Sequence, residues 1–363
     1  MKILHITRSL IVNSGVSVFV AELAGAQAEL GHEVHLRYTW LLEYPVNEKV
    51  DSKTFKSLDE LGFVPDVVHI HAFWSMDMIR AMKWCRKHNV PYVVSPHGGL
   101  MPRVLSKGWL KKHVFYWFFL KKNLCNAVAI HCTGEGEVAA VKVLGLRTPT
   151  FIAPLGCHLP EWPVKKLPDK KKTVLFLSRI SEEKGLAYLL DAWKNVSPKG
   201  WQLIIAGPDW RGYRQVLERK VAAESIHGIE FVGPADVQMK ARLYRTADLF
   251  VLPSPMENFS MVVLDALAYG ILVICTKGTP WGSIMVQDCG WWVEPNSVDA
   301  LSRALQEAVT LTEEQRLSKG VRSRRLAAGY AWGVIGKETV CWYQKKMAQA
   351  SNDSDRRRTR DAL

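Results

Sequence analysis

Residues 249–276, LFVLPSPMENFSMVVLDALAYGILVICT, place two short apolar runs on either side of a helical pattern. The first run leads into a loop bracketed by Pro253 and Pro255, and the helical pattern opens near Ser260. A strand, a helix and a second strand in this order predict a βαβ unit, whose two strands are parallel. This stretch decides the fold because short β-rich runs alternate with helical patterns throughout the chain.

The alternation predicts an α/β fold with two doubly wound parallel sheets, each covered by helices on both faces. The predicted strands lie at 2–7, 66–71, 92–99, 127–133, 150–156, 173–179, 201–207, 229–233, 249–254, 271–276 and 290–295. Two consecutive α/β units of similar size imply two domains that face each other across a cleft. Ligands of such sheets bind beyond the carboxyl ends of the strands, which is where we expect the chemistry.

One segment, CHLPEWPVKKLPDKKK at 157–172, has the composition of a linker, with three prolines and five lysines. It divides the chain into an N-terminal domain at 1–156 and a C-terminal domain at 173–330. An amphipathic helix at 331–350 is expected to pack back toward the N-terminal domain. The polar tail at 351–363 is expected to be frayed.

The overall composition is that of a folded protein with acidic partners. The chain has 363 residues, a net charge of +13 and a pI near 9.4, so nucleotides, nucleic acid or anionic lipid are plausible partners. Its seven cysteines are scattered and never in CxxC spacing, which argues against a zinc site or a disulfide framework and favours reduced thiols in the cytosol. Neither a signal peptide nor a membrane-spanning segment is visible.

Two loops at strand ends carry residues suited to binding an anion. Arg179 ends a strand and Lys184 stands with Gly185 at the start of the next predicted helix, which suits a diphosphate. The second loop carries Glu257 just before the helix, a carboxylate that can accept hydrogen bonds from hydroxyl groups. The free amides of Ser260, Met261 and Val262 can face a phosphate, and Asp265 lies further along the helix, where it can hold ribose hydroxyls.

Several histidines stand on or beside the predicted strands of the first domain. His97 ends the run YVVSPH before two glycines, a position at the edge of the sheet. As a lone histidine it is more often structural than functional. His5, His69 and His71 are interpreted as core or strand-end residues, because no metal-ligand spacing pairs them in the sequence.

Five motifs in order resemble the retaining GT-B glycosyltransferases of sequence family 4. The E-x7-D pattern from Glu257 to Asp265 is similar to the E-x7-E signature of that family, SRISEEKG (178–185) to its Arg and Lys phosphate pair, and WQLIIAGP to the strand that follows. SPHGGLMPR (95–103) and GTPW (278–281) resemble a subset that builds lipopolysaccharide and exopolysaccharide. The likeness covers roughly residues 1–350.

The resemblance implies roles for the residues already singled out. Arg179 and Lys184 would bind the donor diphosphate, Glu257 the donor sugar and Asp265 the ribose. The amides that follow Phe259 would support the phosphates, Gly15 would approach the donor, and His97 would contact the reacting sugar or assist the acceptor hydroxyl. It also implies transfer with retention, no cofactor and no metal ion. Three departures are that Asp265 is one methylene shorter than the usual Glu, Ser260 replaces a common Gly, and NSGVSVFV has one glycine where a pair is usual.

The stretch KGWLKKHVFYWFFLKKN, residues 107–123, interleaves cations with aromatic residues. One interpretation is a helix lying on an anionic membrane surface, as expected for a lipid-linked acceptor. The alternative is a helix whose aromatic residues pack into the first domain while its lysines stay solvated. A nucleic-acid surface is a third option that no groove-reading or single-strand motif supports, so no nucleic acid is expected as a partner.

The sequence therefore predicts a glycosyltransferase that moves a sugar from a nucleotide-diphosphate donor to a saccharide acceptor, which we expect to be lipid-linked. It would act in lipopolysaccharide, O-antigen or exopolysaccharide assembly, in the cytoplasm at the inner face of the cytoplasmic membrane. Two rival interpretations stay open. One is a nucleotide-sugar epimerase-like GT-B enzyme, and the other is a nucleotide-sugar-binding protein that has lost its activity.

Overall fold

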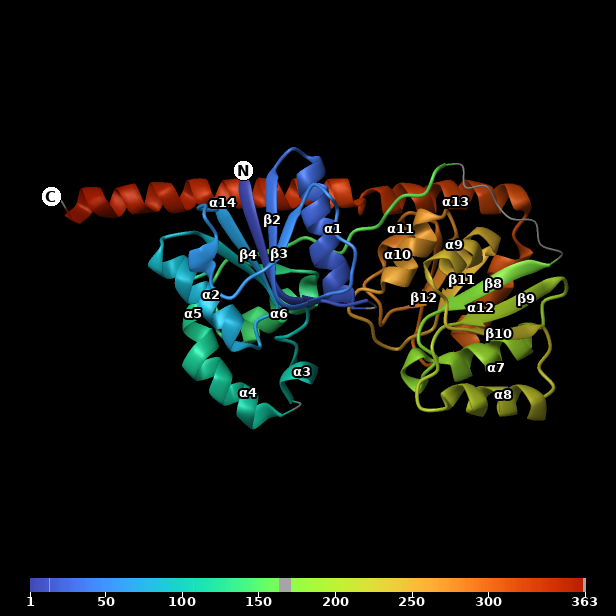
Figure 1. Cartoon of the computed structure of the whole chain (residues 1–363). Coiled ribbons are helices and arrows are strands. Elements are labelled where there is room, and N and C mark those ends of the chain that lie inside the picture. The colour runs from blue at the N-terminus through green and yellow to red at the C-terminus, as the bar shows by residue number, and fades with distance from the viewer. Residues whose placement is uncertain (13, 107, 163–170, 362–363) are drawn as a thin grey trace. The chain divides into compact units, whose positions relative to one another are not determined.

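The computed structural model describes residues 1–12, 14–106, 108–162 and 171–361 (Figure 1). The chain divides into two compact units. Unit 1 consists of Met1–Gly156 together with Trp332–Leu363, and unit 2 consists of Cys157–Ala331. The chain passes from unit 1 to unit 2 after Gly156 and returns after Ala331. Part of the expected linker, residues 163–170, lies outside the described residues.

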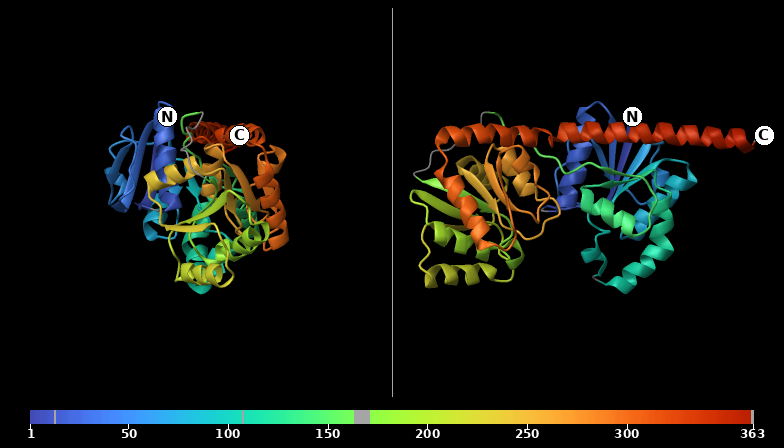
Figure 2. Two further views of the ribbon diagram at one scale, coloured as in Figure 1. Left: turned by 90° about the vertical axis from the view of Figure 1, so that its right-hand side faces the viewer. Right: turned by 180° about the vertical axis from the view of Figure 1, so that it is seen from behind.

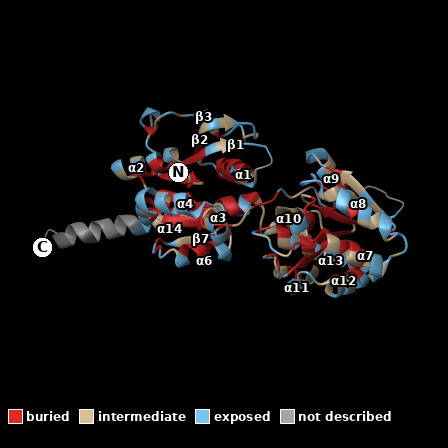
Figure 3. Cartoon of the chain, turned by 90° about the horizontal axis from the view of Figure 1, so that it is seen from below, coloured by how far each residue is buried: buried red, intermediate tan, exposed pale blue. Residues whose placement is uncertain are grey.

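Unit 1 is built on a parallel sheet of seven strands in the order β3-β2-β1-β4-β5-β6-β7. The strands are β1 (Lys2–Leu10), β2 (Glu33–Leu42), β3 (Asp51–Thr54), β4 (Val67–His71), β5 (Tyr92–Ser95), β6 (Ala129–Cys132) and β7 (Thr150–Ile152). The central strands β4, β5 and β6 are buried along their whole length, as expected for a sheet covered on both faces. Figure 3 colours the buried residues of each unit red.

Helices pack on both faces of this sheet. The helices of unit 1 are α1 (Gly15–Glu29), η1 (Leu58–Glu60), α2 (Met76–Lys87), α3 (Pro102–Ser106), α4 (Trp109–Phe115), η2 (Tyr116–Leu120), α5 (Lys121–Cys125), α6 (Glu135–Val143) and α14 (Trp332–Asp361). One core joins the sheet to α1 and α14, and a second core joins the opposite face to α2, α5 and α6. The last helix therefore completes a layer of unit 1, as the views in Figure 2 also show.

The last helix extends beyond its expected end. α14 continues to Asp361, whereas the sequence predicted a helix that ends near residue 350 and a tail from 351. Neither Gly nor Pro interrupts the chain between Ala350 and Asp361, so no residue there forces the backbone to leave the helix. Residues 362 and 363 lie outside the described part of the chain.

Unit 2 has a parallel sheet of six strands in the order β10-β9-β8-β11-β12-β13. The strands are β8 (Lys172–Leu177), β9 (Trp201–Ala206), β10 (Ile229–Gly233), β11 (Leu249–Leu252), β12 (Leu272–Thr276) and β13 (Gly290–Val293). The helices are η3 (Glu182–Lys184), α7 (Leu186–Val196), α8 (Tyr213–Ala223), α9 (Val237–Thr246), α10 (Met261–Ala268), α11 (Ser283–Val286), α12 (Val298–Thr310) and α13 (Glu313–Ala328). The predicted fold class, two α/β units with doubly wound parallel sheets, is confirmed.

Each sheet reverses its winding at one pair of neighbouring strands. In unit 1 that pair is β1 and β4, and in unit 2 it is β8 and β11. Doubly wound sheets bind ligands in the crevice beyond the carboxyl ends of the strands at this switch point. The loops after β8 and β11 are therefore the first places to look for a site in unit 2, and the loops after β1 and β4 in unit 1.

The sequence predicted a single helix for the aromatic segment before β6, and the structure shows that the segment is not one regular helix. It forms α4, a π-helical turn at η2 and α5. The turn rotates Tyr116 and Leu120 into the core, while Trp117 and Phe118 between them stay exposed. The packing interpretation is therefore correct for Tyr116 and Leu120, whereas contact of the exposed aromatic residues with a membrane stays a prediction; Lys107 lies outside the described residues.

Candidate functional site

The site that the sequence predicted in unit 2 lies at its switch point. The loop after β8 carries Arg179 and Lys184, and the loop after β11 carries Glu257 and Ser260. β8 and β11 are hydrogen-bonded neighbours, so the carboxyl ends of both strands lie side by side. Residues that are far apart in the sequence are brought together at this edge of the sheet.

Two glycines let the loops approach closely. Gly185 has a positive φ of 70°, and a Cβ atom added there would lie 2.4 Å from the carbonyl oxygen of Pro253. Gly278, from GTPW, lies so close to the β11 loop that an added Cβ would be 1.9 Å from the carbonyl oxygen of Pro255. Lys184 is in a short 3₁₀ turn, η3, before α7, and not at the start of the helix as predicted.

Lys184 and Glu257 form an ion pair at the centre of the site. The Lys184 ammonium donates to Oε1 of Glu257, and both side chains are mostly buried, with 18% and 13% of their surface exposed. The backbone N–H of Glu257 donates to the carbonyl of Gly278 at 2.8 Å, which fixes the loop that carries the carboxylate. A cation and a carboxylate predicted to serve different parts of one ligand therefore neutralise each other here.

Arg179, in the same loop as Lys184, packs against an aromatic ring. Its guanidinium carbon lies 4.8 Å from the centre of the Trp210 ring, and Nη2 donates to Glu183 at 3.3 Å. The backbone N–H of Trp210 donates to the carbonyl of Ile180 at 3.0 Å, so the loop after β9 is attached to the loop after β8. Sequence reasoning missed Trp210 because no spacing rule connects it to Arg179.

The start of α10 has the shape expected of an anion-binding helix end. Ser260 precedes the helix with a φ of 70° and a ψ of 72°, a left-handed conformation that glycine adopts without strain. This explains why a glycine is common at the position. The amides of Met261 and Val262 belong to the first turn, which leaves them without intrahelical partners. The buried Trp281 of GTPW donates its indole N–H to the carbonyl of Phe259 at 2.5 Å and so holds the helix start in place.

Four buried polar atoms at this edge have no hydrogen-bond partner within the described residues. They are Nε of Arg179 and the hydroxyl oxygens of Ser181, Ser254 and Ser260, and we call them the open polar set. An unsatisfied buried polar group costs about 1–3 kcal/mol, so four at one place point to a ligand that supplies partners. Ser181 and Ser254 were not predicted, because a serine in a loop carries no sequence signal of its own.

Asp265 lies further along α10 and faces α9. Burial raises the pKa of its carboxyl group to about 6, against the lowering effect of Lys240 and His158. Burial raises the pKa of the Tyr244 phenol in α9, and the Asp265 charge adds to that rise. The contact of Asp265 with a ribose stays a prediction.

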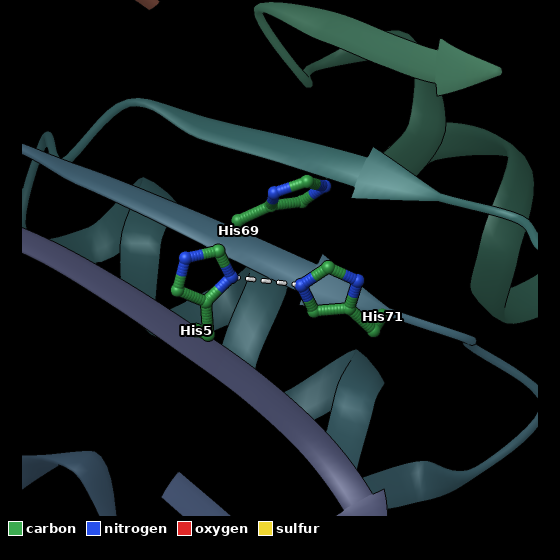
Figure 4. Close-up of side chains that lie close together, drawn as sticks. All are labelled: His5, His69 and His71. Atoms are coloured by element: carbon green, nitrogen blue, oxygen red, sulfur yellow. Dashed lines mark hydrogen bonds between the residues drawn. The ribbon is translucent and has the colours of Figure 1, made fainter. Parts of the chain in front are cut away.

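In unit 1 the structure gathers the histidines that the sequence left separate. His5, His69, His71 and His131 are buried, and His97 is partly buried at the end of β5 (Figure 4 shows the first three). His5 lies beside His69 in the register of β1 and β4, and Nδ1 of His5 is 2.9 Å from Nε2 of His71. The interpretation of His5, His69 and His71 as core or strand-end residues is confirmed, since all three are buried in β1 and β4. The statement that nothing pairs them was wrong, because only the register of the strands brings them together.

Ring nitrogens of His5, His69 and His71 all lie within 4.8 Å of one another, a spacing that metal ligands could share. Hydrogen bonds already engage these nitrogens, however. Both nitrogens of His69 are engaged, Nε2 with Ser95 at 2.6 Å and Nδ1 with Tyr343 at 2.6 Å. Burial lowers the pKa of His5 to about 4 and that of His97 to about 3, and it lowers those of His69 and His71 well below the usual value, so the rings are neutral near pH 7.

The turn that carries His97 is strained and tightly held. His97 has a positive φ of 49°, and Gly98 follows with 77°. The buried carboxylate of Glu137 accepts a hydrogen bond from the N–H of Gly98 and two from Thr133, at 2.7 and 2.9 Å. Strained backbone held by its surroundings is typical of functional sites.

Gly15 is the first residue of α1, and a Cβ atom there would meet nothing within 4 Å, so packing within the described chain does not require this glycine.

Two family models match the chain. The model "Glycosyl transferases group 1" matches residues 160–324, and the model "Glycosyl transferase 4-like domain" matches residues 52–156. Unit 2 therefore carries a group 1 glycosyltransferase domain, and unit 1 a glycosyl transferase 4-like domain. Their order and fold are those of a GT-B glycosyltransferase.

Similar proteins agree with this class. An uncharacterised glycosyltransferase of Methanocaldococcus jannaschii is 29% identical over 49% of this chain and 46% of its own length. A GDP-mannose:cellobiosyl-diphosphopolyprenol alpha-mannosyltransferase of Komagataeibacter xylinus is 26% identical over 78% and 72%, and the O-antigen chain mannosyltransferase B of Escherichia coli is 25% identical over 52% and 51%. The chain spans about half the length of most curated relatives that it matches.

Solved structures share the fold at low identity. Sucrose-phosphate synthase from Thermosynechococcus elongatus has a TM-score of 0.71 at 18% identity, over 96% of this chain and 99% of that one. The Anabaena protein HepE, in complex with UDP and glucose, has a TM-score of 0.69 at 16% identity, over 95% and 100%. At these identities the likeness shows the fold alone.

Proposed function

We propose that this protein transfers a sugar from a nucleoside-diphosphate donor to a lipid-linked saccharide acceptor, with retention of the anomeric configuration and without a metal ion or cofactor. One observation carries the proposal. The Lys184–Glu257 ion pair and the open polar set meet at the switch point of unit 2, beside the start of α10. Cations, unpartnered donors and free helix amides are what a diphosphate requires, and a carboxylate beside them can accept from sugar hydroxyls.

Donor binding would rearrange the central ion pair. The diphosphate would draw the Lys184 ammonium away from Glu257, together with Nε of Arg179 and the serine hydroxyls. Glu257 would then be free to accept hydrogen bonds from hydroxyls of the donor sugar. Met261 and Val262 would add amide donors, and Asp265 would accept from the ribose. Gly15 and His97 belong to unit 1, where His97 would contact the reacting sugar or assist the acceptor hydroxyl.

The chemistry would be electrostatic. As the bond between the anomeric carbon and the diphosphate oxygen breaks, negative charge grows on the leaving group, and Arg179, Lys184 and the α10 amides stabilise it. The acceptor hydroxyl attacks the anomeric carbon from the same face and gives its proton to the departing phosphate oxygen. Glu257 positions the sugar and stabilises positive charge at its ring, and it forms no covalent bond in this scheme.

The relatives suggest the substrates. One is a GDP-mannose-dependent enzyme that acts on a diphosphopolyprenol-linked disaccharide, another acts on O-antigen chains, and HepE was solved with UDP. These names support the proposal of a lipid-linked acceptor in lipopolysaccharide, O-antigen or exopolysaccharide assembly. The donor base stays open between guanine and uracil, because the shared chemistry lies at the diphosphate.

A membrane surface fits the exposed part of the 107–123 segment. Trp109, Leu110, Trp117 and Phe118 are all more than half exposed, and Lys111 and Lys122 are exposed beside them. Large aromatic side chains next to cations match the headgroup level of an anionic bilayer. No helix in the described chain is long and apolar enough to cross a membrane. We therefore propose peripheral attachment on the cytoplasmic side.

The test of the active site combines binding with transfer. Thermal shifts with UDP, GDP, UDP-glucose and GDP-mannose would identify the donor, because a ligand at 100 times its Kd stabilises the folded state by about 2.7 kcal/mol. Glu257→Gln should keep diphosphate binding but reduce transfer to a lipid-linked saccharide by about 100-fold or more. Glu294→Gln, which breaks the exposed Lys277–Glu294 ion pair of the same unit, is the matched control and should change neither. Unchanged transfer in Glu257→Gln contradicts the assigned role.

The same experiment separates the rivals. An epimerase-like enzyme would convert the nucleotide sugar into an isomer without any acceptor. A binding protein without activity would give the thermal shift but no product with any acceptor. Product formed only when donor and acceptor are both present supports the transferase.

Membrane attachment is tested by sedimentation with vesicles of phosphatidylcholine alone or with phosphatidylglycerol. The wild-type protein should sediment with the anionic vesicles, and Trp117→Ser together with Phe118→Ser should release it. Trp40→Ser, which removes another exposed tryptophan of unit 1, should have no effect. Equal binding by all three proteins contradicts the proposed surface.

A further inference from the structure

The histidines of unit 1 form hydrogen bonds whose directions can be deduced from their ends. A peptide carbonyl can only accept, so His131 donates from Nε2 to Ala153 at 2.7 Å and its Nδ1 is an acceptor. Ser95 therefore donates to Nδ1 of His131 at 2.8 Å. With its one proton used, the Ser95 oxygen accepts from Nε2 of His69 at 2.6 Å, and Nδ1 of His69 accepts from the Tyr343 hydroxyl.

The second branch leads to His97. Oε1 of Gln27 accepts from Nε2 of His5 at 2.7 Å, which leaves Nδ1 of His5 as an acceptor. His71 then donates from Nε2 to His5 at 2.9 Å, and Nδ1 of His71 accepts from Nε2 of His97 at 3.1 Å. We call His97, His71, His5 and Gln27 the histidine relay.

The orientation of Gln27 sets the direction of the relay. Oε1 is the amide atom that lies 2.7 Å from Nε2 of His5, whereas Nε2 of Gln27 is buried with no hydrogen-bond partner within the described residues. Each of the three histidines in the relay is neutral and carries its proton on Nε2 in this arrangement. If the Gln27 carboxamide pointed the other way, each of the three histidines would carry its proton on Nδ1 instead. The relay therefore has only two consistent arrangements of protons.

We propose that the histidine relay is a positioning device that fixes the tautomer of His97. It holds the proton on Nε2 and leaves Nδ1 as the atom that accepts a hydrogen bond from a ligand hydroxyl group. His71, His5 and Gln27 are positioning residues that act through His97. The identity of the hydroxyl as one of a sugar rests on the proposed function, but the tautomer does not.

Two features of the structure support a fixed orientation. The strained backbone of His97 is held by Glu137 through the amide of Gly98, so the ring cannot turn freely with its loop. The Phe19 ring lies edge-on to His97 with ring centres 5.1 Å apart, which restricts the imidazole from the side of α1. A ring with one bonded nitrogen and packed surroundings can present the other nitrogen in only one direction.

The test is nuclear magnetic resonance of the full-length protein with ¹⁵N-labelled histidine. Chemical shifts of ring nitrogens distinguish protonated from unprotonated atoms. The wild-type protein at pH 7 should show His97, His71 and His5 neutral with the proton on Nε2. A proton on Nδ1 of His97, or exchange between its two nitrogens, overturns the proposal. So does a bound metal ion that uses ring nitrogens of His5, His69 and His71.

A pair of variants separates positioning from packing. His71→Asn keeps an acceptor near the place of Nδ1 and should preserve the His97 tautomer. His71→Leu removes the acceptor and should give a second His97 species with the proton on Nδ1. Tyr343→Phe, which breaks only the other branch, should leave His97 unchanged. An identical His97 tautomer in the His71→Asn and His71→Leu variants overturns the proposal. If His71→Leu does not fold, the wild-type spectrum decides, because it shows which nitrogen of His97 carries the proton.

This readout does not depend on transfer. A protein with the expected tautomer and no transferase activity would refute the proposed function while leaving the relay in place. An active transferase with a mixed His97 tautomer would do the opposite.

Discussion

The two units share a winding order, yet they treat the polar groups of their sheets in opposite ways. In unit 1 the buried histidines of the central strands are bonded to one another and to Ser95, Gln27 and Tyr343, and all of their ring nitrogens named above have partners, although Nε2 of Gln27 has none within the described residues. In unit 2 the open polar set is buried with no partner in the described chain. Satisfied buried networks fix orientation, whereas unsatisfied groups store free energy that a ligand can release. We therefore call the edge of unit 1 that carries the histidines the rigid edge, and the edge of unit 2 that carries the open polar set the binding edge.

The largest expected effect tests the rigid edge. Glu137→Ala should lower the free energy of unfolding by about 3–5 kcal/mol, because three donors of Gly98 and Thr133 lose their buried acceptor. Urea denaturation followed by circular dichroism measures it. Glu135→Ala, in the exposed first turn of the same helix, should change stability by no more than about 1 kcal/mol. Equal effects of the two substitutions contradict a special role for Glu137.

The second prediction tests the close approach of the two loops in unit 2. Gly185→Ala should cost about 2–4 kcal/mol, because a left-handed backbone and a contact with the Pro253 carbonyl are combined at one position. Gly212→Ala is the matched control, since its φ is 74° and nothing lies within 4 Å of an added Cβ. It should cost only the backbone strain of about 1–2 kcal/mol. If both variants lose the same stability in thermal unfolding, the loops are not packed as described.

The third prediction concerns Asp265, whose pKa is raised from 3.8 to about 6 by burial. The folded state therefore binds the proton more tightly than the unfolded state, and ionisation costs stability as the pH rises from about 4 to 6. The penalty is complete above that range and absent below it. Asp265→Asn should stabilise the protein by about 2 kcal/mol at pH 7.5, and the gain should vanish near pH 3.5.

The control for this prediction is Asp299→Asn, an exposed residue in the first turn of α12 that should bring no gain. The same Asp265 variant should bind the nucleotide diphosphate more weakly if the carboxylate holds the ribose. A stabilised variant with unchanged nucleotide affinity would separate the buried charge from any binding role.

The sequence predicts most of the binding edge and little of the rigid one. Arg179, Lys184 and Glu257 could be placed together because the carboxyl ends of parallel strands meet, and that rule needs only the order of elements. The pairing of His5 with His69 depends on which residues of β1 and β4 lie opposite, and a shift of one residue would turn every side chain to the other face.

Other features depended on tertiary contacts with no local pattern. β3 has the sequence DSKT, which lacks the apolar or β-branched run of a typical strand and is stabilised as the outer partner of β2. Tyr343 reaches His69 from the other end of the chain. Ser181 and Ser254 are ordinary loop residues until burial removes their water. These two members of the open polar set could therefore be found only in the structure.

The smallest expected effect concerns the ring that positions Arg179. Trp210→Ala should weaken binding of UDP or GDP by about 2–5-fold, since a cation over an aromatic ring at a half-exposed site contributes about 0.5–1 kcal/mol. Isothermal titration calorimetry measures the affinity, and thermal unfolding should show little change. Without the ring, the hydrogen bond to Glu183 is the contact within the described residues that still orients the guanidinium.

Arg211→Ala is the control for Trp210, because its guanidinium carbon lies 5.7 Å from the centre of the same ring but belongs to no predicted contact. This variant should bind the nucleotide as the wild type does. A loss in Arg211→Ala equal to that in Trp210→Ala would mean that the positive charge of the loop matters and the ring does not. A loss far above 10-fold in Trp210→Ala would mean that the indole touches the nucleotide itself, and the binding edge of unit 2 would then extend to the loop after β9.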